Sequence, residues 1–304
     1  MYPAESKKKL FSSKIGSEGK FVGWVCILIT LSIWAAFSIS LRWISHSALS
    51  SWDVAFIRYS VPAIILLPFV HARIIRLFSV KPLHMLMIAC GGGIPYFMLT
   101  AIGGGYTSAA HVSALVAGTV PLSVAILRYT FWNEEIVLGK RIGLTAIIAG
   151  VLLLVLSLGR LTPEMVYGSL FLLTASLLWG WFTIGIRLSG LDPISCLILM
   201  TYPTFLILSA LIYTGAVPSN LGHVELSDIG LFAVIQGGAT GIISPLCYSA
   251  AIKRLGALKC ASIGALAPVL TTLLAVPLLN EPLTIMGSLG VSIIVTGVML
   301  SNRY

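Results

Sequence analysis

Charged residues are scarce in this chain. Of its 304 residues only 10% are Asp, Glu, Lys or Arg, whereas 58% are hydrophobic, and the mean hydropathy is +1.00. A soluble domain of this length needs far more polar side chains to cover its surface. The composition therefore excludes a water-soluble protein and indicates a chain that crosses a membrane many times.

Cysteine is also rare: the five cysteines fall one to each apolar run, with no close pair. This spacing predicts neither a disulfide framework nor a zinc site. The sequence has no HExxH metal-binding motif, no nucleophile elbow and no Gly-Lys-Ser/Thr phosphate loop, and Asp53, Asp192 and Asp228 stand in loops or at the ends of apolar runs. We therefore expect a protein that is not an enzyme and has no cofactor or metal.

Basic residues lie between the apolar runs and form no stripe, although the net charge is +9. This arrangement predicts membrane topology and no binding of nucleic acid. Residues 1–20 are polar and basic, and we expect them to form a cytoplasmic tail. With the tail inside, the outer side holds only Arg42 and Arg160, while Arg58 lies within a span. The positive-inside rule thus places both termini of this multi-pass membrane protein in the cytoplasm.

Apolar runs long enough to cross a membrane, about 20 residues each, occur ten times. They lack the strict alternation of barrel strands, so we expect α-helices. The predicted spans are 21–45, 53–71, 83–104, 108–132, 139–158, 166–188, 194–214, 228–252, 258–279 and 283–301.

The second half of the chain repeats the first. Five positions recur at a constant offset of 147 residues (268 − 121 for the first pair), and Trp34 is matched by Trp179. Each half has an odd number of spans, so the second copy enters the membrane from the opposite side. We therefore predict an all-α polytopic membrane protein of ten transmembrane helices in two inverted five-helix repeats, 21–158 and 166–301. The recurring positions are Pro121 and Pro268, Asn133 and Asn280, Glu134 and Glu281, Gly143 and Gly290, and Gly150 and Gly297.

Each half ends with a proline-bearing span, a turn with Glu, and a glycine-spaced span that ends in GVLLL or GVML; the turns read Asn133-Glu134 and Asn280-Glu281-Pro282-Leu283. In this doubled signature the chain, from about residue 21 to 301, resembles the EamA-type transporters of the drug/metabolite transporter superfamily. The resemblance implies a basket of helices one to four and six to nine around a central cavity, with five and ten at the periphery. It also implies export of amino acids or other small metabolites without ATP. Glu135 stands where the second copy has Pro282, so the two turns need not share one shape.

Polar side chains inside spans are costly and therefore indicate a substrate path. Gln236, Thr240 and Ser244 recur every four residues in the eighth span and Tyr248 extends the row, so an α-helix places them on one face. Hydrogen bonding of the Ser and Thr hydroxyls to their own helix is the alternative. His111, in the fourth span, either titrates during transport or is packed and hydrogen-bonded.

Trp34 and Trp179 lie near the middle of spans one and six, whereas a tryptophan that anchors a helix lies at the membrane interface. With Tyr96 and Tyr248 they form aromatic walls that suit a planar or aliphatic side chain, and core packing is the alternative. Arg58 either extends to the outer interface or faces the cavity, where its guanidinium binds a substrate carboxylate through two hydrogen bonds.

Pro121 and Pro268 lie near the middle of repeat-related spans, and each removes a backbone donor. We expect both to act as hinges, although proline is common in membrane helices for other reasons. The glycines of spans five and ten predict close packing within the monomer, with a homodimer contact as the alternative.

Together these features predict a secondary transporter that moves amino acids or similar small metabolites across the inner membrane by alternating access, surrounded by membrane lipids. One alternative is an exchanger of sugar phosphates or nucleotide sugars. Such dianions call for two or more buried cations, and Arg58 is the only Lys or Arg near mid-depth in a span. A membrane scaffold without transport is the other alternative.

Overall fold

The computed structural model describes residues 17–44, 47–107, 109–157, 162–279 and 284–303. Within these ranges the chain forms helices and no strand, and ten helical stretches are long and apolar enough to cross a membrane. The predicted fold class, an all-α polytopic membrane protein with ten spans, is confirmed.

Each predicted span corresponds to one helical stretch. The first helix begins at Ser17, before the predicted start at residue 21, so it includes the last residues of the expected tail. The first-half spans are α2 (Ser17–Ile44), α3 (Ser51–Val70), α5 with α6 (Pro82–Gly92 and Ile94–Gly105), α7 with α8 (Ala109–Val116 and Val120–Trp132) and α9 (Leu138–Ser157). The second-half spans are α10 (Pro163–Ser189), α11 (Pro193–Tyr213), α12, η1 and α13 (Leu226–Phe232, Ala233–Ile243 and Ser244–Leu255), α14 with α15 (Ala257–Gly264 and Ala267–Leu279) and α16 (Ile285–Arg303). The short helix α4 (Ile74–Phe78) follows α3.

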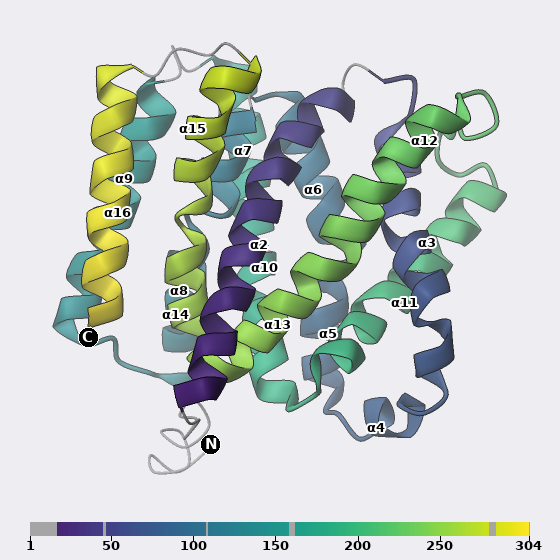
Figure 1. Ribbon diagram of the computed structural model, residues 1–304, viewed down its shortest axis with the longest axis horizontal. Helices are drawn as coiled ribbons and strands as arrows, with labels where there is room; N and C mark the ends of the chain where they lie inside the picture. Colours follow the sequence, from purple (N-terminus) through teal and green to yellow (C-terminus); the bar gives the residue numbers. More distant parts are fainter. Residues whose placement is uncertain (1–16, 45–46, 108, 158–161, 280–283, 304) are drawn as a thin grey trace.

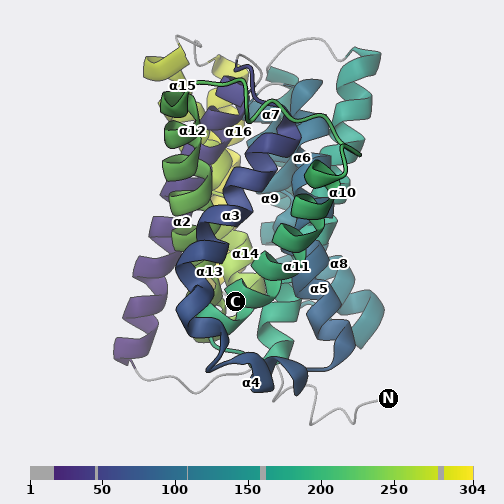
Figure 2. The ribbon, with the colours of Figure 1, turned by 90° about the vertical axis from the view of Figure 1, so that its right-hand side faces the viewer.

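The two halves run through the bundle in opposite directions. In Figure 1 the start of α2 and the end of α16 lie at the lower end of the bundle, where α8 also leads into α9. The equivalent helices of the second half, α15 and α16, end and begin at the upper end. Figure 2 shows α4 at the lower end and the loop from α11 to α12 across the upper end. This is the inverted arrangement that an odd number of spans per repeat requires.

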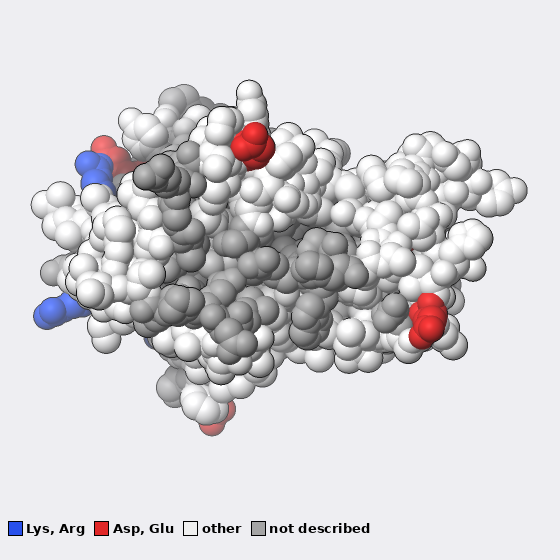
Figure 3. All heavy atoms as spheres, turned by 90° about the horizontal axis from the view of Figure 1, so that it is seen from above, with Lys and Arg blue, Asp and Glu red and all other residues white. Residues whose placement is uncertain are grey.

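Basic side chains are sparse on the upper face. Figure 3 shows this face to be mostly uncharged, with a few acidic and few basic groups among the described residues. The lower end instead holds the pairs of Arg73 with Asp192 and of Arg128 with Glu134. The side of the membrane that each end of the bundle faces remains a prediction.

The signature turn between α8 and α9 has a clear physical basis. Asn133 ends α8 in the left-handed conformation, with φ 48°, which asparagine adopts more readily than most residues. Glu134 then turns back and pairs with Arg128, whose Nε lies 2.7 Å from its Oε2. The repeat-related turn at Asn280, Glu281 and Pro282 lies outside the described residues.

Two repeat-related spans are interrupted just before a proline. Helices α8 and α15 each begin one residue ahead of Pro121 and Pro268 respectively. Proline has no N–H to donate to the preceding turn and fits the first turn of a helix, so each proline ends one helix and starts the next. The interruptions fall where the sequence predicts them, and the role of the prolines as hinges remains a prediction.

The glycines of α9 and α16 let these two helices touch along their backbones at the edge of the bundle (Figure 1). A Cβ atom on Gly150 would lie 2.7 Å from the Gly290 carbonyl oxygen, and one on Gly143 would lie 2.4 Å from the Ser301 nitrogen. The small-residue faces thus pack within the monomer. A homodimer contact has to use another surface.

Residues at the start of α3 are hydrogen-bonded to the loop between α11 and α12. The Asp53 carboxylate, fully buried, accepts hydrogen bonds from the backbone N–H of Ser50 at 2.9 Å, the Ser219 hydroxyl at 2.6 Å and the backbone N–H of Asn220 at 2.9 Å. The Ser50 hydroxyl donates to the Pro218 carbonyl in turn. These bonds join the two repeats at the upper end of the bundle.

Candidate functional site

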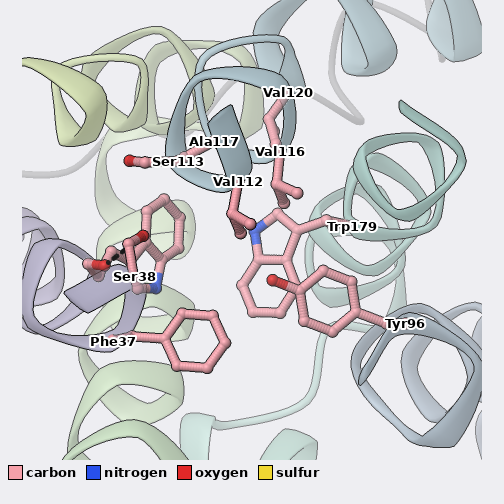
Figure 4. A pocket seen from close by; sticks show the side chains of 10 residues that line it. Phe37, Ser38, Tyr96, Val112, Ser113, Val116, Ala117, Val120 and Trp179 are labelled. Carbon is pink, nitrogen blue, oxygen red and sulfur yellow. Dashed lines mark hydrogen bonds between the residues drawn. The ribbon is translucent and has the colours of Figure 1, made fainter. Parts of the chain in front are cut away.

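A small cavity of about 30 Å³ lies inside the bundle between the two repeats (Figure 4). Its walls come from α2, α6, α7, the start of α8 and α10. Ala117 lies in the interruption ahead of Pro121 and Val120 is the first residue of α8, so this break in the fourth span forms part of the wall. A volume of this size holds a few water molecules at most, so the cavity has no room for a metabolite in this conformation.

Aromatic side chains from both repeats line the cavity. Trp34 and Trp179 meet edge to face, with ring centroids 5.6 Å apart and an interplanar angle of 80°. The Tyr96 ring lies 4.7 Å from that of Trp179, and Figure 4 shows its hydroxyl and the Trp179 indole nitrogen pointing toward the cavity. Tyr248 stands behind the tryptophans and shares a 3.0 Å hydrogen bond with Thr183. Trp34, Tyr96 and Trp179 are thus in the wall, and Tyr248 supports it.

Arg58 is buried next to this cavity. Its side chain is 3% exposed, so it is packed inside the bundle and does not reach the molecular surface. This placement favours the second of the two sequence interpretations, and binding of a carboxylate remains a prediction. The guanidinium carbon lies 5.1 Å from the ring centre of Phe37, 5.5 Å from that of Phe97 and 5.9 Å from that of Tyr59. Phe37 also lines the cavity, so a single ring separates the guanidinium from it. Aromatic faces stabilise a cation without neutralising it.

No carboxylate forms an ion pair with Arg58 in the part of the chain that the structure describes. Its Nη1 donates to the side-chain oxygen of Gln236 at 3.0 Å, while its Nε–H is buried and has no hydrogen-bond partner there. Arg58 is also the one Lys or Arg with a buried side chain among the described residues. A buried charge normally has a charged or fully hydrogen-bonded partner, so this site is electrostatically incomplete.

The EamA-like transporter family model matches residues 21–156 and 166–303, which is nearly the whole chain in two copies. The chain belongs to the EamA-like transporter family. The family is part of the drug/metabolite transporter superfamily, so the resemblance seen in the sequence is confirmed. The protein is accordingly a multi-pass membrane transporter of small molecules.

Two further comparisons concern the whole chain. No match is found among curated proteins. A solved structure described as "Crystal structure of protein" has 18% sequence identity and a TM-score of 0.69, and the alignment covers 94% of this chain and 97% of that one. At this identity the match supports the fold of the EamA-like chain and says nothing about its substrate.

The polar row of the eighth span differs from its prediction in this EamA-like transporter. The segment from Ala233 to Ile243 is a π-helix, η1, so the four-residue spacing no longer corresponds to one turn of an α-helix. Gln236, Thr240, Ser244 and Tyr248 are nevertheless all buried. The Thr240 hydroxyl donates to the carbonyl of its own helix five residues back, at Ile235, as the alternative interpretation expected. Among the four, Gln236 is the one that reaches Arg58.

His111 lies beside the cavity wall. It is 1% exposed and precedes Val112, which lines the cavity, but its own side chain is not part of the lining. The structure therefore places it among packed residues of α7. A role in proton transfer remains a prediction.

Sequence analysis missed two residues that complete the site of the EamA-like transporter. Phe37 lies between Arg58 and the cavity, and Ser40 accepts a 3.0 Å hydrogen bond from the Gln236 side-chain nitrogen. Phe37 follows Trp34 by three residues, which is a helical spacing, whereas Ser40 follows it by six, which is not. That spacing is a usable signal for Phe37, which shares a face with Trp34, whereas a serine in an apolar helix gives no signal of its own.

Proposed function

We propose that this EamA-like transporter exports amino acids or similar small carboxylates with an aromatic or aliphatic side chain, and that it does so by alternating access. In this account the Arg58 guanidinium binds the carboxylate, and the walls formed by Trp34, Tyr96 and Trp179 receive the side chain. Phe37 moves aside to join the two compartments. Both termini lie in the cytoplasm, and the membrane is the inner membrane.

The observation that carries the proposal is the incomplete Arg58 site. The Arg58 guanidinium is 3% exposed, surrounded by three aromatic rings and bonded to one neutral amide, and its Nε–H has no hydrogen-bond partner. A substrate carboxylate supplies the missing charge and two acceptor atoms in the planar geometry that arginine favours. A cation left without a counter-charge inside a bundle is costly, which argues for a bound anion as its partner.

Alternating access is supported by the two inverted repeats and the small size of the cavity. Inverted repeats commonly place a substrate site near the middle of the membrane, where the repeats meet. The cavity of about 30 Å³ is too small for an amino acid, so binding requires the walls to separate. The interruptions at Pro121 and Pro268 provide points where two spans can bend without losing further backbone hydrogen bonds.

A sugar-phosphate or nucleotide-sugar exchanger fits the site less well. Such substrates carry two negative charges, and Arg58 is the one buried cation of the Lys or Arg type among the described residues. Counterflow in proteoliposomes tests the choice directly. We expect uptake of labelled aromatic or branched aliphatic amino acids into vesicles preloaded with the same compound, and none of a sugar phosphate or a cationic dye. Exchange of the sugar phosphate alone would contradict the proposal.

A further inference from the structure

Gln236 occupies the position where a buried arginine ordinarily meets an acid. Its side-chain oxygen accepts a hydrogen bond from Arg58 Nη1 at 3.0 Å, although the two residues come from different repeats and lie 178 positions apart in the sequence. Gln236 is fully buried, so solvent water cannot replace Arg58 as its hydrogen-bond partner. A neutral amide is therefore the hydrogen-bond partner of the cation in this conformation.

The orientation of this amide is fixed by a chain of hydrogen bonds. The Ser40 hydroxyl donates to the Phe37 carbonyl at 2.8 Å, so its oxygen is left to accept. It accepts from Gln236 Nε2 at 3.0 Å. Because the nitrogen end of the amide must face Ser40, the oxygen end must face Arg58. The hydrogen bonds of Ser40 in α2 thus orient the Gln236 amide for its bond to Arg58.

The backbone of η1 brings Gln236 to Arg58. A Cβ atom on Gly241 would lie 2.6 Å from the Arg58 carbonyl oxygen, and one on Gly237 would lie 2.6 Å from the Val61 side chain. Both glycines let η1 approach α3 more closely than any side chain would permit. Helices of the π type are frequent at functional sites, and here the π segment carries the residue that meets the buried cation.

We propose that Gln236 is a positioning residue that occupies Arg58 while the transporter is empty and is displaced by the substrate carboxylate. This inference rests on the proposed function of Arg58 as the carboxylate site. The amide offers one neutral oxygen to one N–H, whereas a carboxylate offers two charged oxygens and also reaches the unused Nε–H. Displacement breaks one hydrogen bond between α3 of the first repeat and η1 of the second, so substrate binding weakens the contact between the two repeats at the buried cation.

Two substitutions at Gln236 have opposite expected effects. Gln236→Glu places a carboxylate beside Arg58 and competes with the substrate, so binding of L-phenylalanine becomes weaker. Gln236→Leu removes the competitor and leaves the cation unpartnered, so L-phenylalanine binds more tightly than in the wild type. Phenethylamine, which lacks the carboxylate, changes little in either variant. A purely structural role for Gln236 would weaken both ligands in both variants.

The experiment is a titration of the purified full-length protein with L-phenylalanine and with phenethylamine, followed by the ligand-induced shift in melting temperature. We expect Gln236→Glu to weaken L-phenylalanine binding by roughly tenfold or more, since each tenfold corresponds to about 1.4 kcal/mol, and Gln236→Leu to strengthen it. Asn302→Asp is the matched control, because it makes the same amide-to-acid change on α16, where Asn302 donates to the Val298 carbonyl far from Arg58 along the chain.

Binding by the Arg58 variant and by the two Gln236 variants distinguishes failure of the inference from failure of the proposed function. If Arg58→Ala abolishes L-phenylalanine binding but both Gln236 variants bind as the wild type does, Gln236 is not displaced and the inference is overturned while the anchor stands. If Arg58→Ala binds as well as the wild type, or the wild type shows no shift, the carboxylate anchor fails and the inference with it. Should Gln236→Leu fail to fold, the Gln236→Glu arm decides alone, and unchanged binding there overturns the inference.

Discussion

Trp34 and Trp179 occupy equivalent positions in the two repeats, and their rings meet edge to face 5.6 Å apart in the wall of the cavity. Inverted repeats bring equivalent residues together where the repeats face each other. The contact therefore marks the place where the two halves of the transporter meet. Any separation of the halves has to open this contact, since both indoles line the cavity and are also buried in the core.

The proline interruptions are expected to matter more for transport than for folding. Pro121→Ala and Pro268→Ala each restore a backbone N–H and allow a continuous, stiffer helix through the middle of the span. We predict lower counterflow rates with little change in melting temperature. Proteoliposomes containing each variant at equal protein density give the rates, and wild-type turnover in both variants would remove the hinge role.

The Asp53 contacts are expected to stabilise the upper end of the bundle. Asp53→Asn replaces a carboxylate that accepts from Ser50, Ser219 and Asn220 by an amide with one acceptor oxygen. Leaving buried donors unpaired costs about 1–3 kcal/mol, so the melting temperature should fall by several degrees. Glu225→Gln, at an exposed residue of the same loop region, is the control. An equal melting temperature for wild type and Asp53→Asn would contradict the role given to these bonds.

Asp192, at the lower end of the bundle, is expected to make the free energy of unfolding depend on pH. Burial alone would raise the pKa of this carboxyl, but hydrogen bonds from the Ser195 hydroxyl and N–H and the charge of Arg73 together lower it below its ordinary value of 3.8. A group with a lowered pKa in the folded state stabilises that state above its unfolded pKa and loses the effect as the pH falls.

We therefore predict that acidification below the ordinary pKa of an aspartate lowers the melting temperature of the wild type more than that of Asp192→Asn. Scans of melting temperature across acidic pH measure the difference. Parallel curves for the two proteins would show that Asp192 contributes nothing to the acid response.

Most of the fold could be predicted from the sequence. Each span is a separate run of apolar residues, so its position follows from local composition, and the offset between Pro121 and Pro268 reveals the duplication without any structure. The turn at Asn133 and Glu134 could be placed as well, because both residues act on neighbouring positions: one ends α8 and the other pairs with Arg128.

The site was harder to predict because its contacts join residues far apart in the chain. Arg58 lies about 10 Å along α3 from the first residue of that helix. From this depth an arginine side chain can either reach the membrane interface or point into the bundle. Its hydrogen-bond partner inside the bundle is Gln236. The four-residue spacing around Gln236 assumed an α-helix, whereas the segment is a π-helix held against α3 by Gly237 and Gly241. Backbone geometry of this kind depends on tertiary packing and leaves no periodic signal.

The central claim, that Arg58 binds a substrate carboxylate, is tested most directly by comparing equilibrium binding of an amino acid and its decarboxylated amine to wild type, Arg58→Lys and Arg58→Ala. The account predicts that the wild type strongly prefers the amino acid. Binding of the amino acid becomes clearly weaker in Arg58→Lys, because an ammonium lacks the planar pair of donors. In Arg58→Ala the amino acid loses roughly 2–5 kcal/mol of binding free energy and the preference disappears. Free substitution by Lys, together with an undiminished preference in Arg58→Ala, would contradict it.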